Sequence, residues 1–250
     1  MKKLLLGAFV ALLPLTGFTA TVFGFQAGAG TWAHDPSGDI TASVNGAGTS
    51  ADLKNDLQLG EKTEGYAYFV VEHPVPLIPN LKFVNTKLSS SGSGTANTTF
   101  SFNGQSFNTT NPLATSLTLD QTDAILYYEI LDNDLVSFDI GLTAKAISGK
   151  ASVDDNINPL QTASFSATIP MLYVAAEIGL PAGFTLAAEM SNISAGNNTI
   201  SDITTKVTYT TDFMLGVEAG IRSQNYTIDV DSVKASMKFS GLFMGVYFKF

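Results

Sequence analysis

The sequence has no cysteine, and it has no long apolar run after its first twenty residues. Without cysteine, neither a disulfide nor a lipid-modified N-terminal cysteine can form, so the fold must be stable without disulfides. A transmembrane helix needs roughly 20 consecutive apolar residues, and no later segment reaches that length. Charged residues are also few, at 14%, and the acidic ones outnumber the basic ones by 22 to 13. This acidic balance argues against a nucleic-acid partner, which requires basic groups to neutralise phosphates.

The chemistry-bearing motifs of common enzymes are missing as well. No G-x-S-x-G or H-E-x-x-H pattern occurs, and the whole chain has two histidines, His34 and His73. The sequence therefore predicts no catalytic residue, no cofactor-binding residue, no metal site and no cofactor. We expect the protein not to be an enzyme.

The first twenty residues have the composition of a secretory signal peptide. Met1-Lys2-Lys3 is basic, residues 4–15 are apolar and contain Pro14, and small residues precede Ala20. We expect cleavage after Ala20, although cleavage a few residues later stays open because Phe18 is bulky for such a site. The mature chain would then be residues 21–250, a single domain with a net charge of −11.

What the sequence does have is many short runs rich in strand-forming residues. Mean hydropathy is +0.19 although no long apolar run follows residue 20. Alternating strands of a membrane barrel explain this combination, and a soluble sandwich is the alternative. Gly, Asn, Asp, Pro and Ser separate the runs. The ten runs are 22–33, 63–74, 81–91, 116–131, 135–147, 164–180, 183–193, 200–211, 213–226 and 233–250.

The connections between these runs alternate between short and long. The short ones are 74–80, 131–134, 180–183 and 210–212, and the long ones are 34–62, 92–115, 148–163, 194–199 and 227–232. Outer-membrane barrels have tight periplasmic turns and longer outer loops, and a soluble sandwich has no reason to alternate in this way. We therefore predict an all-β fold, a transmembrane antiparallel up-and-down β-barrel of ten strands, with eight strands as the alternative.

A two-residue period within the runs separates a lipid face from an interior face. In 233–250, for example, Leu242 and Phe248 belong to the apolar face, and Tyr247 and Lys249 belong to the other. A lysine or arginine on the lipid face costs about 2–4 kcal/mol near the midplane, so charged residues should lie inside. The predicted interior charged residues are Glu72, Lys82, Asp123, Glu129, Asp139, Lys145, Glu177, Glu189, Lys206, Glu218 and Arg222.

The last ten residues, Gly241 to Phe250, end in Tyr247-Phe248-Lys249-Phe250. This ending resembles the C-terminal assembly signal of bacterial outer-membrane proteins, with Tyr247, Phe248 and Phe250 as its aromatic residues. Further segments resemble a family of small proteobacterial outer-membrane β-barrel proteins of unestablished activity: Phe23–Trp32, Ala51–Leu57, Val71–Asn80, Asp123–Asp132 and Gly216–Arg222. The resemblance implies the barrel fold and the outer membrane of a Gram-negative bacterium. It implies no activity.

Several polar segments allow a functional or a structural interpretation. His34-Asp35 follows the first run and could form part of a protease site at the outer rim. The Pro74, Pro76 and Pro79 segment next to His73 is better explained as a tight turn. The acids in 35–39, 154–155 and 229–231 lack the spacing of a calcium loop. Ser50 could cap a short helix over residues 52–57 that covers the barrel mouth.

Barrels of about eight strands have interiors that side chains just fill, so ten strands leave little more room and exclude a wide porin. The sequence favours a non-enzymatic barrel with a narrow, charged interior and a structural or surface-interaction role. A narrow cation-preferring channel is the alternative, because the interior acids outnumber the bases, and a rim protease is a distant third. The expected partners are outer-membrane lipid and lipopolysaccharide, with the barrel-assembly machinery and periplasmic chaperones during biogenesis. We expect a monomer.

Overall fold

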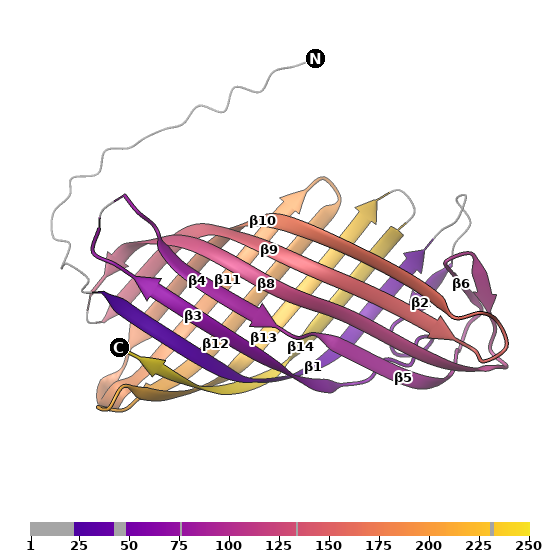
Figure 1. The fold of residues 1–250 in the computed structure, drawn as a ribbon, viewed down its shortest axis with the longest axis horizontal. Coiled ribbons are helices and arrows are strands. Elements are labelled where there is room, and N and C mark those ends of the chain that lie inside the picture. The colour runs from indigo at the N-terminus through magenta and orange to yellow at the C-terminus, as the bar shows by residue number, and fades with distance from the viewer. Residues whose placement is uncertain (1–22, 43–48, 76, 134, 231–232) are drawn as a thin grey trace, which may run out of the picture.

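The computed structural model describes residues 23–42, 49–75, 77–133, 135–230 and 233–250. Within these residues the chain forms one closed antiparallel barrel of ten strands, joined in chain order around the ring (Figure 1). The prediction of ten strands is confirmed. They are β1 (Gly24–Ala42), β3 (Lys62–Glu72), β4 (Asn80–Thr86), β8 (Pro112–Asp132), β9 (Val136–Asp154), β10 (Gln161–Gly179), β11 (Phe184–Ala195), β12 (Asn198–Thr210), β13 (Leu215–Val230) and β14 (Val233–Lys249).

The remaining elements are short, and two of them, β2 (Ser50–Asp52) and β5 (Ser89–Thr95), belong to the same sheet. β2 pairs with β1, and β5 continues from β4 and pairs with β8. β6 (Phe100–Phe102) and β7 (Gln105–Phe107) form a separate hairpin. The 3₁₀ turn η1 (Pro181–Gly183) joins β10 to β11. No helix in the described part of the chain is long and apolar enough to cross a bilayer. The predicted signal peptide, residues 1–20, lies outside the described residues.

The last strand closes the barrel against the first. β14 pairs with β1 from Lys249 opposite Gln26 to Val233 opposite Ala42. Beyond β14, Phe250 exchanges two backbone hydrogen bonds with Phe25, at 2.9 and 2.8 Å. Closure leaves no free edge in this part of the sheet. The start of β1 and Phe250 lie at the same end of the barrel (Figure 1), which we call the turn end. The opposite end, where β2 and β6 lie, is the loop end.

The strands run further toward the loop end than the sequence predicts. β1 continues to Ala42, β9 continues to Asp154 and β8 begins at Pro112. Most of the residues expected in the long loops 34–62, 92–115 and 148–163 therefore belong to strands or short hairpins. The prediction stopped where apolar residues cease to alternate on the lipid side. The strands continue beyond this point, with polar residues in place of apolar ones on the outside of the sheet.

The barrel therefore has two halves: the apolar face of the sheet points outward in one half and inward in the other. β14 shows this exchange of polarity well. In the turn-end half, Leu242 and Phe248 point outward and are 66% and 45% exposed. In the loop-end half, Lys238 is exposed on the outside, while Met237 and Phe239 point inward and are buried. The turn-end half is thus apolar outside, as a bilayer requires. The loop-end half is apolar inside, like a water-soluble protein.

The predicted short helix over 52–57 is not formed. Asp52 ends β2, and its carbonyl accepts hydrogen bonds from the amides of Asp56 and Leu57 at 3.1 and 3.0 Å, which gives a single turn. The carboxylate of Asp52, and not Ser50, caps this turn by accepting from the amides of Lys54 and Asn55. Nucleation of a helix is unfavourable in free energy, and a single turn forms too few hydrogen bonds to offset it.

Candidate functional site

The barrel interior contains two layers of ion pairs, stacked along the axis. The layer nearer the loop end centres on Asp202. Arg222 binds its carboxylate through two nitrogens, Nε at 3.0 Å and Nη2 at 2.7 Å, which is the strong bidentate geometry. Lys145 Nζ lies 3.1 Å from Asp202 and 2.8 Å from Asp123. Lys145 is 1% exposed, so its charge depends on these partners.

Amide side chains extend this loop-side layer across the lumen. Gln121 donates to Gln224 at 2.9 Å and to the hydroxyl of Tyr226 at 2.8 Å. Gln224 in turn donates to Asp202 at 2.8 Å. Gln121 and Gln224 are 1% and 0% exposed, and the network satisfies both. These residues lie on β8, β12 and β13, so their hydrogen bonds cross the lumen at this level.

The second layer lies nearer the turn end. Lys206 Nζ is 3.3 Å from Glu189 and 3.2 Å from Glu218, and Lys82 pairs with Glu189. The hydroxyl of Tyr66 donates to Glu218 at 2.7 Å. Opposite charges alternate around this layer, so most of the charges that sequence alternation placed inside have a partner.

Interior glycines make room for the aromatic rings beside this turn-side layer. A Cβ at Gly28 would lie 2.5 Å from the Tyr68 ring, and one at Gly216 would lie 2.1 Å from the Tyr247 ring. Each ring therefore lies directly on the backbone of a neighbouring strand. Alanine at either position would displace the ring into the lumen.

A cavity of about 80 Å³ separates the two layers. Its lining includes Trp32 and Asp123, and Arg222 lies over the Trp32 ring at 5.2 Å. Trp32 Nε1 and Asp123 Oδ1 are buried and have no hydrogen-bond partner among the described residues. A water needs only about 10–15 Å³ of such volume, so the cavity has room for waters that bond to both atoms.

A second cavity of about 80 Å³ lies on the turn-end side of the turn-side layer. Acidic side chains line it, and the hydroxyl of Tyr127 donates to Glu72 at 3.0 Å. Asp139 and Glu177 also line it, and Glu129 is half-buried on the strand beside Asp139. The excess of acids that the sequence predicts for the interior is therefore concentrated at the turn end.

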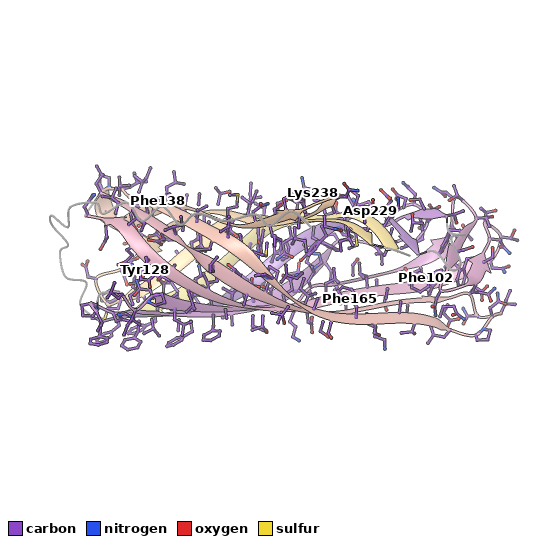
Figure 2. All side chains as sticks on the ribbon, turned by 90° about the horizontal axis from the view of Figure 1, so that it is seen from above. Phe102, Tyr128, Phe138, Phe165, Asp229 and Lys238 are labelled. Carbon is purple, nitrogen blue, oxygen red and sulfur yellow. The ribbon has the colours of Figure 1, made fainter. Side chains whose placement is uncertain are left out.

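An apolar plug fills the loop-end half of the lumen. The chain between β1 and β3 contributes Leu53 and Leu57, and the β6–β7 hairpin contributes Phe100, Phe102 and Phe107, all buried. Figure 2 shows Phe102 at this end. Phe100 and Phe107 stack with ring centroids 5.4 Å apart. Described parts of the segments predicted as outer loops thus fold into the mouth and form a hydrophobic core there.

Asp202 is the main interior residue that sequence reasoning missed. It lies on β12, four residues before Lys206, and so shares the inward face of that strand. The two-residue period that identified Lys206 could have identified Asp202 as well. The uncharged members of the network, Gln121 and Gln224, carry no such signal, since polar side chains occur on both faces of these strands.

The histidines do not form the rim site that is the third alternative from the sequence. His34 lies within β1 and not at a rim, because the strand continues for eight more residues, to Ala42. Its ring is 0% exposed, between Trp32 at 5.1 Å and Phe239 at 6.0 Å. Asp35 points to the other face of the sheet and pairs with Lys54 at 2.5 Å. His34 and Asp35 are therefore not brought together, and His34 does not reach solvent.

His73 serves the turn between β3 and β4. Its Nδ1 accepts the amide of Val75 at 3.2 Å, and its Nε2 lies 3.2 Å from the carbonyl of Pro79. This agrees with the structural interpretation of the proline-rich segment. Among the described residues, no group of three or more His, Cys, Asp or Glu side chains is arranged to hold a metal ion. Asp231, one of the loop acids, lies outside the described part of the chain.

Together, the closed ring and the apolar belt define a transmembrane β-barrel of the outer-membrane type. The chain is similar in fold to the outer membrane protease OmpT of Escherichia coli, with a TM-score of 0.61 and 8% identity over 94% of this chain and 98% of that one. A second match is Ail, the attachment invasion locus protein of Yersinia pestis, with a TM-score of 0.42 and 10% identity over 92% of this chain and 100% of that one. No family model and no curated protein matches the sequence. At these identities the likeness shows the fold alone.

Proposed function

We propose that this protein is a non-enzymatic barrel of the bacterial outer membrane, closed to solutes, which presents its loop-end half to other molecules at the cell surface. The observation that carries this proposal is the exchange of polarity between the two halves. A barrel that only had to span a bilayer needs strands of about 9–11 residues. β1, β9 and β10 each have 19 residues, and β8 has 21.

The two layers of ion pairs and the apolar plug support this proposal over a channel. A solute entering from the turn end meets the turn-side layer, then the loop-side layer, and then the apolar plug. Opening such a path would leave buried charges without partners, which costs several kcal/mol for each charge. The acidic cavity at the turn end is the feature that favours a cation channel, and it ends at the first of these layers.

The conductance of the purified, folded protein in planar bilayers tests the proposal directly. We expect no discrete current steps in KCl, because three barriers lie in series. Folding is verified by the faster migration of the unheated barrel on SDS gels. Reproducible cation-selective steps from the folded protein would refute the closed barrel and establish the channel.

The absence of enzymatic activity needs its own measurement. We expect the folded protein to leave a mixture of fluorogenic peptides uncleaved, because His34 is buried between aromatic rings. The variant H34A is the control for any trace of cleavage. Cleavage that H34A abolishes, in a protein that still folds, would contradict this part of the proposal.

A further inference from the structure

One edge of the sheet remains open in the loop-end half. β10 pairs with β9 along almost its whole length, from Gln161 opposite Val153 to Ile178 opposite Val136. On its other side, β11 pairs with β10 only from Leu172 onward. The β11–β12 hairpin turns back at residues 195–198 and so ends well below the top of β10. No described strand pairs with this side of residues 161–171.

The backbone groups of this open edge can be assigned from the register. The amide of Gly179 donates to Leu135, on the β9 side. The register with β9 has no shift, and successive residues of a strand direct their N–H and C=O groups to opposite sides. Even-numbered residues of β10 therefore face the open edge. Thr162, Ser164, Ser166 and Thr168 present both groups there, and Pro170 presents a carbonyl only.

Side-chain exposure confirms that this edge is uncovered. All seven residues from Thr162 to Thr168 are exposed, on both faces of the sheet. Elsewhere in the loop-end half, inward apolar side chains are buried or partly buried, but Phe165 points inward and is 51% exposed. Its ring lies over Gly149 of β9. Viewed from above, Phe165 lies on the opposite wall from Asp229 and Lys238 (Figure 2).

The edge also lacks the features that keep sheet edges from pairing. Natural edge strands carry lysine, proline, inward charges or bulges, or are kept very short. Residues 161–169 contain no charge and no proline, and no register shift interrupts their pairing with β9. An unprotected edge of this length above the apolar belt is a template for another extended strand.

The surroundings define the chemistry of that strand. The added strand must have the same pattern as the other strands of the loop-end half, with apolar side chains inward and polar side chains outward. Ile169, Ile193 and Ile228 lie at the margin of the apolar core and are only partly buried. On the outside, Lys150 lies opposite Ser164 on β9, is exposed, and has no ion pair among the described residues. An acidic residue on the outward face would pair with Lys150.

A second copy of this chain fits less well. The segment Thr162-Ala-Ser-Phe-Ser-Ala-Thr168 reads the same in both directions, so antiparallel self-pairing would match like with like. In one membrane, however, both copies run β10 in the same sense relative to the bilayer. Antiparallel pairing of the two edges would invert one barrel.

From these observations we propose that the open edge of β10, residues 161–169, binds an extended peptide segment of a partner protein as an added antiparallel strand. The segment alternates apolar and polar residues and carries an acidic residue on its polar face. This inference rests on the surface-interaction role proposed above and names the kind of partner. Backbone hydrogen bonds supply the affinity, and the alternation supplies the specificity.

The test uses a fluorescein-labelled, C-terminally amidated nine-residue peptide that alternates valine with threonine and has glutamate at the central polar position. Binding to the full-length folded barrel in detergent micelles is followed by fluorescence anisotropy. Two N-methylated peptides are compared with it. In an antiparallel pair, two residues that exchange backbone hydrogen bonds have their side chains on the same face. The even residues of β10 bond to the added strand and point outward, so the peptide residues that bond to them are its outward-facing threonines and glutamate. Methylation at the threonine and glutamate amides should therefore abolish binding, and methylation at the valine amides should leave it unchanged.

Two variants of one residue complete the test. S166P removes an amide that faces the edge and should weaken binding at least tenfold, whereas S166A keeps this amide and should bind like the parent. Both are verified to fold by gel migration before and after heating. Any other pattern overturns the proposal: no binding of the unmethylated peptide, equal effects of the two methylations, or equal binding by S166P and S166A. A dimer of the purified barrel that S166P dissociates would assign the edge to a second copy instead. Conductance plays no part in these outcomes, so they are independent of the test for a closed lumen.

Discussion

Lys145 illustrates what individual residues contribute to this barrel. Its ammonium group has lost nearly all contact with solvent and is held by Asp123, Asp202 and Gln121. Sequence alternation was sufficient to predict an inward lysine. It could not predict the partner Asp202, because β9 and β12 are not neighbours in the sheet and their side chains meet across the lumen. Contacts of that kind depend on the tilt and stagger of the closed ring.

Removing this charge should be costly. We expect K145M to lower the free energy of unfolding by about 3–5 kcal/mol, because Asp123 loses the cation beside it and stays buried. Equilibrium unfolding in urea, with the protein in lipid vesicles, measures the loss. The matched control is K87M, which removes a lysine 2.5 Å from Asp120 on the outer surface, where both side chains are partly exposed. That pair should contribute at most about 1 kcal/mol. Equal losses in the two variants would contradict the role assigned to the interior layer.

At the scale of a single element, β14 shows what alternation predicts and where it stops. The assignment of Leu242 and Phe248 to the lipid side agrees with their exposure. The pattern does not reveal that the environment outside the strand changes from lipid to water near Ser240. A two-residue period reports only that two faces differ. Which face is apolar changes along this strand, and the position of the change depends on the depth of the barrel in the membrane.

A lysine scan along the outward face of β14 locates this boundary. We expect V246K to destabilise the folded barrel by about 2–4 kcal/mol, because Val246 lies in the middle of the outward apolar positions 242–250 and the charge enters the hydrocarbon region. S236K, on the same face of the same strand, should change stability by less than about 0.5 kcal/mol, as is usual for water-exposed positions. Unfolding in lipid vesicles compares the two. A similar cost at both positions would mean that the belt extends over the whole strand.

At the scale of the whole molecule, strand number and closure could be predicted from the sequence. The predicted alternation of short and long connections is wrong in detail, because residues 196–197 alone join β11 to β12 at the loop end, whereas residues 211–214 join β12 to β13 at the turn end. The plug could be predicted only in part. The apolar spacing of Leu53 and Leu57 indicated a segment that could cover the mouth, whereas nothing local distinguishes the segment of Phe107 from a loop that extends into water. Membership in a particular proteobacterial family stays a prediction, as does the signal peptide.

The absence of cysteine allows the orientation in the cell to be tested with single cysteines. L160C lies in the exposed connection between β9 and β10 at the loop end, and D212C lies in the exposed turn at the other end. On intact cells, a membrane-impermeant maleimide should label L160C and not D212C. Both should be labelled once the outer membrane is permeabilised. Labelling of D212C alone on intact cells would place the barrel upside down or in another membrane.

The exchange of polarity along the strands also fixes how the strands slide against one another. A slip of one residue turns every side chain to the other face, and most barrels with one apolar face would resist it. A slip of two residues returns every side chain to its original face. It would cost little free energy in a barrel whose two faces keep the same polarity along the whole strand. Here it would shift one strand by roughly 6.6 Å relative to its neighbours. Lipid-facing residues would then enter water, and core residues of the plug would lose their contacts. The boundary between the two halves thus fixes the register of every strand that crosses it.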